Sequence, residues 1–180
     1  MRSIVITIAV AGAALILAGC VPSLHPLYTE ESTVFKDSLL GTWISDSGAK
    51  CKFTESGKTN YELLYVDEAP VRFEARLIEL GGVTFLDLYQ QENEYSLVRA
   101  HLIARVTIGK DSISIALLNY DWLRKLSDQN KLNLAHERLT DGTLVLTAST
   151  RELQAFILSN ANNKEAFGDT EVFHSLTPGR

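Results

Sequence analysis

The chain has 180 residues, of which 46% are hydrophobic and 22% are charged, and its formal net charge is −5. These proportions are typical of a globular protein and argue against disorder. The acidic balance argues against a nucleic-acid partner, and against electrostatic docking on anionic lipid, because both need clustered Lys and Arg.

The N-terminus carries one positive charge, at Arg2, followed by fifteen largely apolar residues from Ile4 to Ala18. As a helix this run would rise about 22 Å, which is short of the roughly 30 Å hydrocarbon core of a bilayer. The run is therefore predicted to be the apolar part of a secretion signal rather than a membrane span.

The apolar run ends in Leu17-Ala18-Gly19-Cys20, which resembles the lipobox of bacterial lipoprotein precursors. The resemblance implies that a signal peptidase recognises Leu17, Ala18 and Gly19, that cleavage falls before Cys20, and that the Cys20 sulfur is lipidated. In such precursors an aspartate after the cysteine often signals inner-membrane retention, and the residue here is Val21, so the outer membrane is expected. Two or more acyl chains would hold the protein stably on the bilayer. The alternative is an ordinary secretion signal with a chance cysteine.

The next residues are predicted to be a lipidated tether, because Pro22 and Pro26 favour extended backbone over helix. A single β-barrel-like domain and a short tail follow. The predicted segments are the signal peptide 1–19, the tether 20–38, the domain 39–175 with a helix near 150–160, and the tail 176–180.

Period-two alternation indicates a first β-hairpin around Gly81-Gly82, since two-residue loops favour glycine. With that loop, apolar residues match on one face and an ion pair lies on the other. The predicted pairs are Leu77 with Leu86, Ala75 with Leu88, and Arg76 with Asp87.

A second hairpin is predicted around Gly109-Lys110, pairing Val106 with Ile113, Ala104 with Ile115, and Leu102 with Leu117. The stretches GTWIS, KCKFT, NYELLYV and GTLVLTA supply further candidate strands. About eight short strands joined by turns predict an antiparallel up-and-down meander that closes into a barrel or curls into a sandwich.

Two helices are predicted outside the strands. The first spans roughly Tyr120 to Ser127, with Trp122, Leu123 and Leu126 on one side. The second begins at a capping box formed by Ser149 and Glu152. Its apolar stripe needs a partner surface, which the outward face of the first hairpin could provide. The stripe is Leu153, Phe156 and Ile157, and the proposed partners are Ile78 and Phe85.

Gly41-Thr42-Trp43 resembles the G-x-W signature of lipocalins, which are eight-stranded up-and-down barrels with a helix packed outside after the last strand. The resemblance implies that Trp43 closes the barrel base beneath an arginine, for which Arg151 is the candidate. The T-D-Y signature of lipocalins is absent in its usual form. The stretches SLHPLYTEE, LLGTW, NYDWL and LTASTRELQAF also resemble a group of uncharacterised bacterial lipoproteins, which have no assigned activity.

No catalytic, metal or cofactor site is predicted. Gly57-Lys58-Thr59 lacks the preceding glycine of a phosphate-binding loop, since Lys52 occupies that position. No helical pair of zinc-binding histidines and no G-x-S-x-G motif occurs. Cys51 alternates with polar neighbours and is expected to be a buried, inert strand cysteine; a disulfide to Cys20 would contradict lipidation. The protein is therefore expected not to be an enzyme.

Two functions are left open. In the first, a membrane-anchored lipoprotein binds a small apolar ligand inside the barrel, lined by Phe73, Ala75 and Ala104. In the second, the barrel is filled and the protein is a structural or interaction lipoprotein of an envelope complex. An eight-stranded barrel is compatible with both, because its interior either fills with side chains or holds one small ligand.

Overall fold

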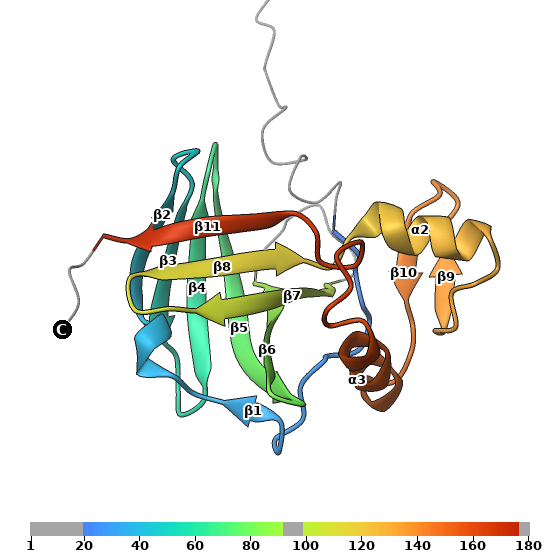
Figure 1. The fold of residues 1–180 in the computed structure, drawn as a ribbon, viewed down its shortest axis with the longest axis horizontal. Helices are drawn as coiled ribbons and strands as arrows, with labels where there is room; N and C mark the ends of the chain where they lie inside the picture. The colour runs from blue at the N-terminus through green and yellow to red at the C-terminus, as the bar shows by residue number, and fades with distance from the viewer. Residues whose placement is uncertain (1–19, 92–98, 177–180) are drawn as a thin grey trace, which may run out of the picture.

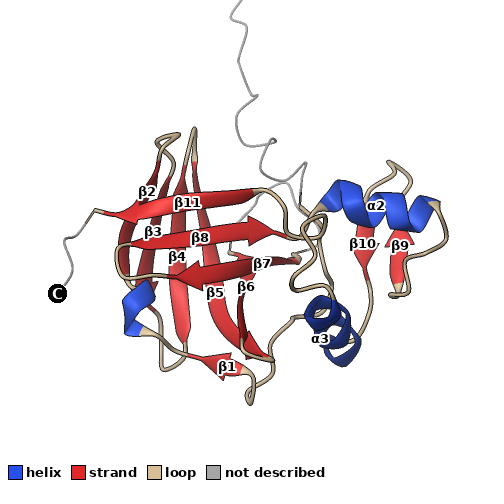
Figure 2. Ribbon diagram, viewed as in Figure 1, coloured by secondary structure: helices blue, strands red, loops and turns tan. Residues whose placement is uncertain are grey.

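Eight antiparallel strands close into a barrel in the computed structural model, which describes residues 20–91 and 99–176 (Figures 1 and 2). Each barrel strand pairs with the next barrel strand along the chain, from β2 to β11. The last strand, β11, also pairs with β2, which closes the barrel. The predicted up-and-down barrel is thus confirmed. The barrel strands are β2 (Gly41–Ser45), β3 (Lys50–Glu55), β4 (Asn60–Val66), β5 (Pro70–Leu80), β6 (Val83–Gln90), β7 (His101–Ile108), β8 (Ser112–Leu117) and β11 (Thr170–Ser175).

The first hairpin has the register that the sequence predicts. Leu77 pairs with Leu86, and the flanking pairs follow in step along β5 and β6. Gly81 and Gly82 form the loop with φ values of 56° and 79°. Both values lie in the left-handed region that glycine adopts without a steric penalty, as a primed two-residue turn requires.

The second hairpin has the predicted faces but not the predicted register. Val106 pairs with Ile115 and Ile108 with Ile113, so β8 is displaced by two residues. The cause is a longer loop, in which the Gly109 amide donates to the Ser112 carbonyl at 2.8 Å. A shift of two residues keeps every side chain on the same face of the sheet, because side chains alternate with a period of two.

The prediction of the eighth barrel strand was wrong. The GTLVLTA stretch forms β10 (Leu144–Leu146), which pairs with β9 (His136–Arg138) in a separate two-stranded sheet. The barrel is closed instead by β11, in which only Phe173 is buried. One inward apolar side chain gives a weak alternation signal. The helix expected after the last strand therefore precedes it.

The apolar side chains form two clusters. The interior cluster lies inside the barrel, and the outer cluster lies between the outer barrel surface and the helical layer. Large interior members are Trp43, Phe53, Tyr61, Leu63, Phe73, Leu77, Leu86, Leu88, Leu102, Ile113 and Phe173.

Both predicted helices are present, and both belong to the outer cluster. These are α2 (Tyr120–Asp128) and α3 (Thr150–Ser159), which lie beside the barrel together with β9 and β10 (Figure 1). The Ser149 and Glu152 capping box is formed. Leu153 and Ile157 of α3 share the outer cluster with Ile78 and Phe85, which confirms the predicted partner surface.

Residues 20–38 do not form a tether. The Ser23 amide donates to the His101 carbonyl and the Leu24 amide to the Leu146 carbonyl, each at 2.9 Å. Val21 and Leu27 are buried. Pro22 and Pro26 do impose extended backbone, but the residues around them bury apolar side chains and add a strand-like connection between the two sheets.

The rest of this N-terminal segment also contacts the barrel. The short strand β1 (Thr33–Val34) pairs with β5 outside the barrel, and the 3-10 turn η1 (Asp37–Leu39) leads into β2. The folded domain thus includes the residues assigned to the tether.

Candidate functional site

Cys20, the predicted lipidation site, is the first residue that the structure describes. Leu17, Ala18 and Gly19 of the lipobox lie outside the described residues. Cys20 forms an isolated bridge with Asn119 and is 4% exposed. Burial raises the pKa of the Cys20 thiol to about 11. A buried, protonated thiol is a poor nucleophile, so lipid attachment at this sulfur requires the segment to be undocked.

The segment after Cys20 is held by backbone pairs and by α3. The Pro22 carbonyl accepts from the Leu146 amide at 2.9 Å. The Thr150 hydroxyl donates to the Pro26 carbonyl at 2.7 Å, and the Gln154 amide donates to the Leu27 carbonyl at 2.8 Å. The segment is therefore attached to both the barrel and the helical layer.

A polar cluster on the outer barrel face holds the same segment. Asp87, 1% exposed, lies with one carboxylate oxygen 2.6 Å from His101 Nδ1, and its other oxygen accepts from the Leu27 amide at 2.7 Å. The His101 ring packs 4.8 Å from Tyr89, centroid to centroid. We call Tyr28, Asp87, Tyr89 and His101 the Asp87 cluster.

The Asp87 cluster contains an acid–histidine pair of the kind found in catalytic triads, and its carboxylate also accepts from the Leu27 amide. Within residues 20–91 and 99–176, no hydroxyl or thiol side chain makes a hydrogen bond to His101. The carboxylate joins the N-terminal segment to β6 and β7.

The sequence placed Arg76 opposite Asp87 as an ion pair, and only the pairing of the backbones is correct. The Arg76 guanidinium pairs with Glu74 at 3.1 Å and lies 4.1 Å above the Tyr28 ring. The sequence signal that could have indicated other partners for Asp87 was its position as a lone carboxylate between Leu86 and Leu88. A buried carboxylate needs hydrogen-bond donors.

The residues predicted to line a ligand site all face the barrel interior. Phe73 is 6% exposed, and Ala75 and Ala104 are fully buried. Ala75 pairs with Leu88 and Ala104 with Leu86, so leucine side chains lie beside both small residues. The structure thus brings the three together in a cluster occupied by large apolar side chains.

The barrel base is closed by a segment before the first strand. Trp43 is buried, and its indole N–H donates to the Leu39 carbonyl of η1 at 3.0 Å. The Phe35 ring stacks on Tyr61 with centroids 4.7 Å apart. Hence η1 and its neighbours cover this end of the barrel.

Arg151 does not take the position above Trp43 that the lipocalin resemblance implies. It is exposed on the first turn of α3, outside the barrel. In the described part of the chain no hydrogen bond or ring contact joins it to Trp43. The indole finds its partner in the backbone of η1 instead.

Cys51 is a free thiol inside the barrel and is 1% exposed. Burial, aided by the negative charge of Glu171, raises its pKa to about 12. Such a thiol is protonated and shielded from reagents.

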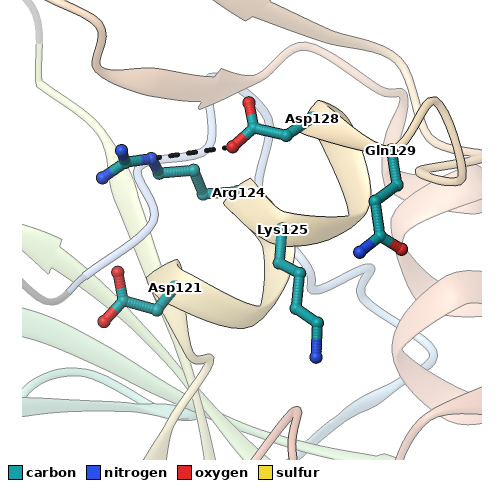
Figure 3. Close-up of a pocket in the computed structure, with 5 residues that line it drawn as sticks. All are labelled: Asp121, Arg124, Lys125, Asp128 and Gln129. Atoms are coloured by element: carbon teal, nitrogen blue, oxygen red, sulfur yellow. Dashed lines mark ion pairs between the residues drawn. The ribbon is translucent and has the colours of Figure 1, made fainter.

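An open groove of about 390 Å³ lies along the exposed side of α2. Its lining is charged and polar, and Arg124 pairs with Asp128 at 3.9 Å (Figure 3). In Figure 3 the Arg124 and Lys125 side chains point in different directions, so they do not converge on one point. The lining residues are Asp121, Arg124, Lys125, Asp128 and Gln129.

The described residues contain no group of three or more His, Cys, Asp or Glu side chains placed to share a metal ion. No helix in the same residues is both long and apolar enough to cross a membrane.

The fold and its connections define the class of protein. It is a closed, eight-stranded, up-and-down antiparallel barrel with a helical insertion between its seventh and eighth strands. No protein-family model, curated protein or solved structure matches the chain.

Proposed function

We propose that this protein is a non-enzymatic lipoprotein of the bacterial cell envelope, anchored to the outer membrane through lipid on Cys20. The observation that carries the proposal is the sequence Leu17-Ala18-Gly19-Cys20 at the end of an apolar run too short to span a bilayer. Lipid on Cys20 would keep the barrel at a membrane surface without a transmembrane helix.

We further propose that the barrel serves as a rigid body that binds an envelope protein through its outer surface. Support comes from the interior cluster, which includes Trp43, Phe53 and Tyr61, each at most 3% exposed. Close-packed side chains of this size leave little room for a guest molecule. The base is also covered by η1, through the Trp43 bond to Leu39.

Carriage of a small apolar ligand is the alternative. It is supported by the barrel class and by Ala75 and Ala104, which face inward between larger side chains. A ligand at that place would have to displace Leu86 or Leu88.

Metabolic labelling with palmitate tests the anchor. The full precursor is expressed in a bacterial host that processes lipoproteins, beside Cys20→Ser and Cys51→Ser variants. We expect label in the wild type and in Cys51→Ser, and none in Cys20→Ser, because only Cys20 belongs to the lipobox. An unlabelled wild-type product would overturn the anchor.

Native mass spectrometry of the protein purified from its host separates the two roles. A reproducibly clean mass, beyond the covalent lipid, supports protein binding. A retained apolar adduct would support ligand carriage and overturn the filled-barrel proposal.

A further inference from the structure

The proposed anchor and the folded domain are separated by almost no chain. Hydrogen bonds of 2.9 Å fix the Pro22 carbonyl and the amides of Ser23 and Leu24 to β7 and β10. Even if Cys20 left its buried position, the two residues back from Pro22 would span at most about 7 Å. The lipid must therefore enter the bilayer next to the fold.

Cys20 lies beside the start of α2. Cys20 forms its bridge with Asn119, and Asn119 caps α2 by accepting from the Trp122 amide at 2.8 Å. Figure 1 shows the start of the described chain beside the start of α2. Because a helix rises 1.5 Å per residue, Lys125 lies only about 9 Å along the axis from Asn119.

The outer side of α2 is exposed, and Asp128 on this side pairs with Arg138 of β9 at 2.7 Å. Trp122 and Leu123 are buried against the outer cluster, whereas Arg124 and Lys125 are exposed. We call the exposed residues Asp121, Arg124, Lys125, Asp128 and Gln129 the α2 face.

We infer that the α2 face lies against zwitterionic phospholipid head groups, so that the barrel is seated directly on the membrane without a spacer. The inference deepens the proposed function and rests on lipidation of Cys20. It assigns an orientation to the domain: α2 is next to the bilayer, and the β3–β4 turn, at the opposite end of the barrel in Figure 1, is remote from it.

The charges of the α2 face suit such head groups. Arg124 and Lys125 can donate to lipid phosphates, and Asp121 can accept from a lipid ammonium. Asp128 is held by Arg138 at 2.7 Å, whereas its contact with Arg124, at 3.9 Å, is long and exposed, so Arg124 is free to exchange that contact for lipid. The α2 face carries two acidic and two basic side chains, and Arg138 neutralises Asp128, so the net charge at this surface is small and a zwitterionic surface is neither strongly attracted nor repelled. The anchor supplies the attraction.

Fluorescence quenching on vesicles tests the orientation. The full precursor is produced in a lipidating host as Lys125→Cys and, as the matched control, Lys58→Cys in the exposed β3–β4 turn. Each protein is labelled with an environment-sensitive dye and reconstituted into phosphatidylethanolamine–phosphatidylcholine vesicles with spin-labelled head groups. Cys51 is buried. Labelling the protein without an added cysteine shows how much dye Cys51 accepts.

We expect several-fold stronger quenching at position 125 than at position 58. Intact mass is measured on the same samples. A lipid adduct with equal quenching at the two positions would overturn the orientation and leave the anchor in place. A mass without lipid would overturn the proposed function, and the orientation with it.

A flexible insertion tests whether the short connection sets the orientation. About ten Gly and Ser residues inserted after Val21 would add a mean span of about 17 Å. We expect the lipid adduct to remain while quenching at position 125 falls toward that at position 58. Unchanged quenching would show that the connection does not position the domain.

Discussion

The Asp87 carboxylate joins two strands of the barrel to the N-terminal segment, with His101 Nδ1 2.6 Å from one oxygen and the Leu27 amide 2.7 Å from the other. The side chain is 1% exposed, so it has no access to water in place of these partners. A buried carboxylate that lost either donor would remain desolvated and underbonded.

We therefore expect Asp87→Asn to destabilise the fold by about 2–3 kcal/mol, because a neutral amide offers one acceptor where two are needed. Urea denaturation measures the loss. Asp67→Asn, in the exposed β4–β5 turn, is the matched control, and it should stay within about 0.5 kcal/mol of wild type.

The same variant should release the N-terminal segment before the barrel unfolds. Limited proteolysis of Asp87→Asn is expected to cut near Leu27 faster than in wild type, since the amide there loses its partner. Equal stability of the Asp87 and Asp67 variants would show that the carboxylate does not hold the segment.

The sequence predicted those parts of the fold whose signals are local. Gly81-Gly82 fixed a two-residue loop, so the Leu77–Leu86 register followed from matching apolar residues alone. The loop around Gly109 is longer than its glycine suggested, and the register there was displaced by two residues. Alternation still placed every side chain on the correct face.

The parts that the sequence did not predict depend on contacts between distant residues. Asp87 lies next to Arg76 on the neighbouring strand, yet its partners are His101 and Leu27, which no periodic pattern connects to it. The tether prediction failed for the same reason. Prolines indicate extended backbone, but they do not show whether water or another strand satisfies that backbone.

Docking of α3 should contribute strongly to stability. Leu153 is fully buried between α3 and the outer barrel face, so Leu153→Ala is expected to cost about 2–5 kcal/mol through lost burial and a residual cavity. Leu158→Ala, on the same helix but 42% exposed, should cost less than about 1 kcal/mol. Thermal or urea unfolding of the two variants gives the comparison, and similar losses would contradict the assigned face of α3.

The barrel base provides a test of the role that the lipocalin resemblance assigned to Arg151. Trp43→Phe removes the indole bond to the Leu39 carbonyl and should cost about 1–2 kcal/mol. Arg151→Ala should change stability by less than about 0.5 kcal/mol, because the side chain is exposed. The double variant should be additive in denaturant unfolding. A strong coupling energy between the two substitutions would support the predicted contact between Trp43 and Arg151.

The turn between β5 and β6 tests a close approach to α3. Both glycines have positive φ, so Gly82→Ala should cost about 1 kcal/mol. Gly81→Ala should cost more, since its added Cβ would lie 2.8 Å from Leu158 Cδ1. In a Leu158→Ala background the excess should disappear, as measured by a double-mutant cycle of unfolding free energies. If the extra cost of Gly81→Ala persisted in that background, its cause would be backbone strain rather than a clash with Leu158.

The buried thiol of Cys51 makes a pH-dependent prediction. Its pKa is about 12 in the folded protein against an ordinary 9.0, because burial disfavours the thiolate. Between these values the unfolded chain has released a proton that the folded chain retains. Stability should therefore fall as pH rises above 9.

Chemical labelling measures the reactivity of the same thiol. A Cys20→Ser protein is used, because Cys51 is then the remaining cysteine. At pH 8 the folded protein should react with a disulfide reagent at least roughly a thousandfold more slowly than the urea-unfolded protein, because its thiolate is scarce and shielded. A Cys51→Ser protein, tested for stability between pH 8 and 10.5, should lose less stability than one that retains the thiol. Rapid reaction of folded Cys51 would mean that the barrel interior opens to solvent, which would favour ligand carriage over the filled barrel.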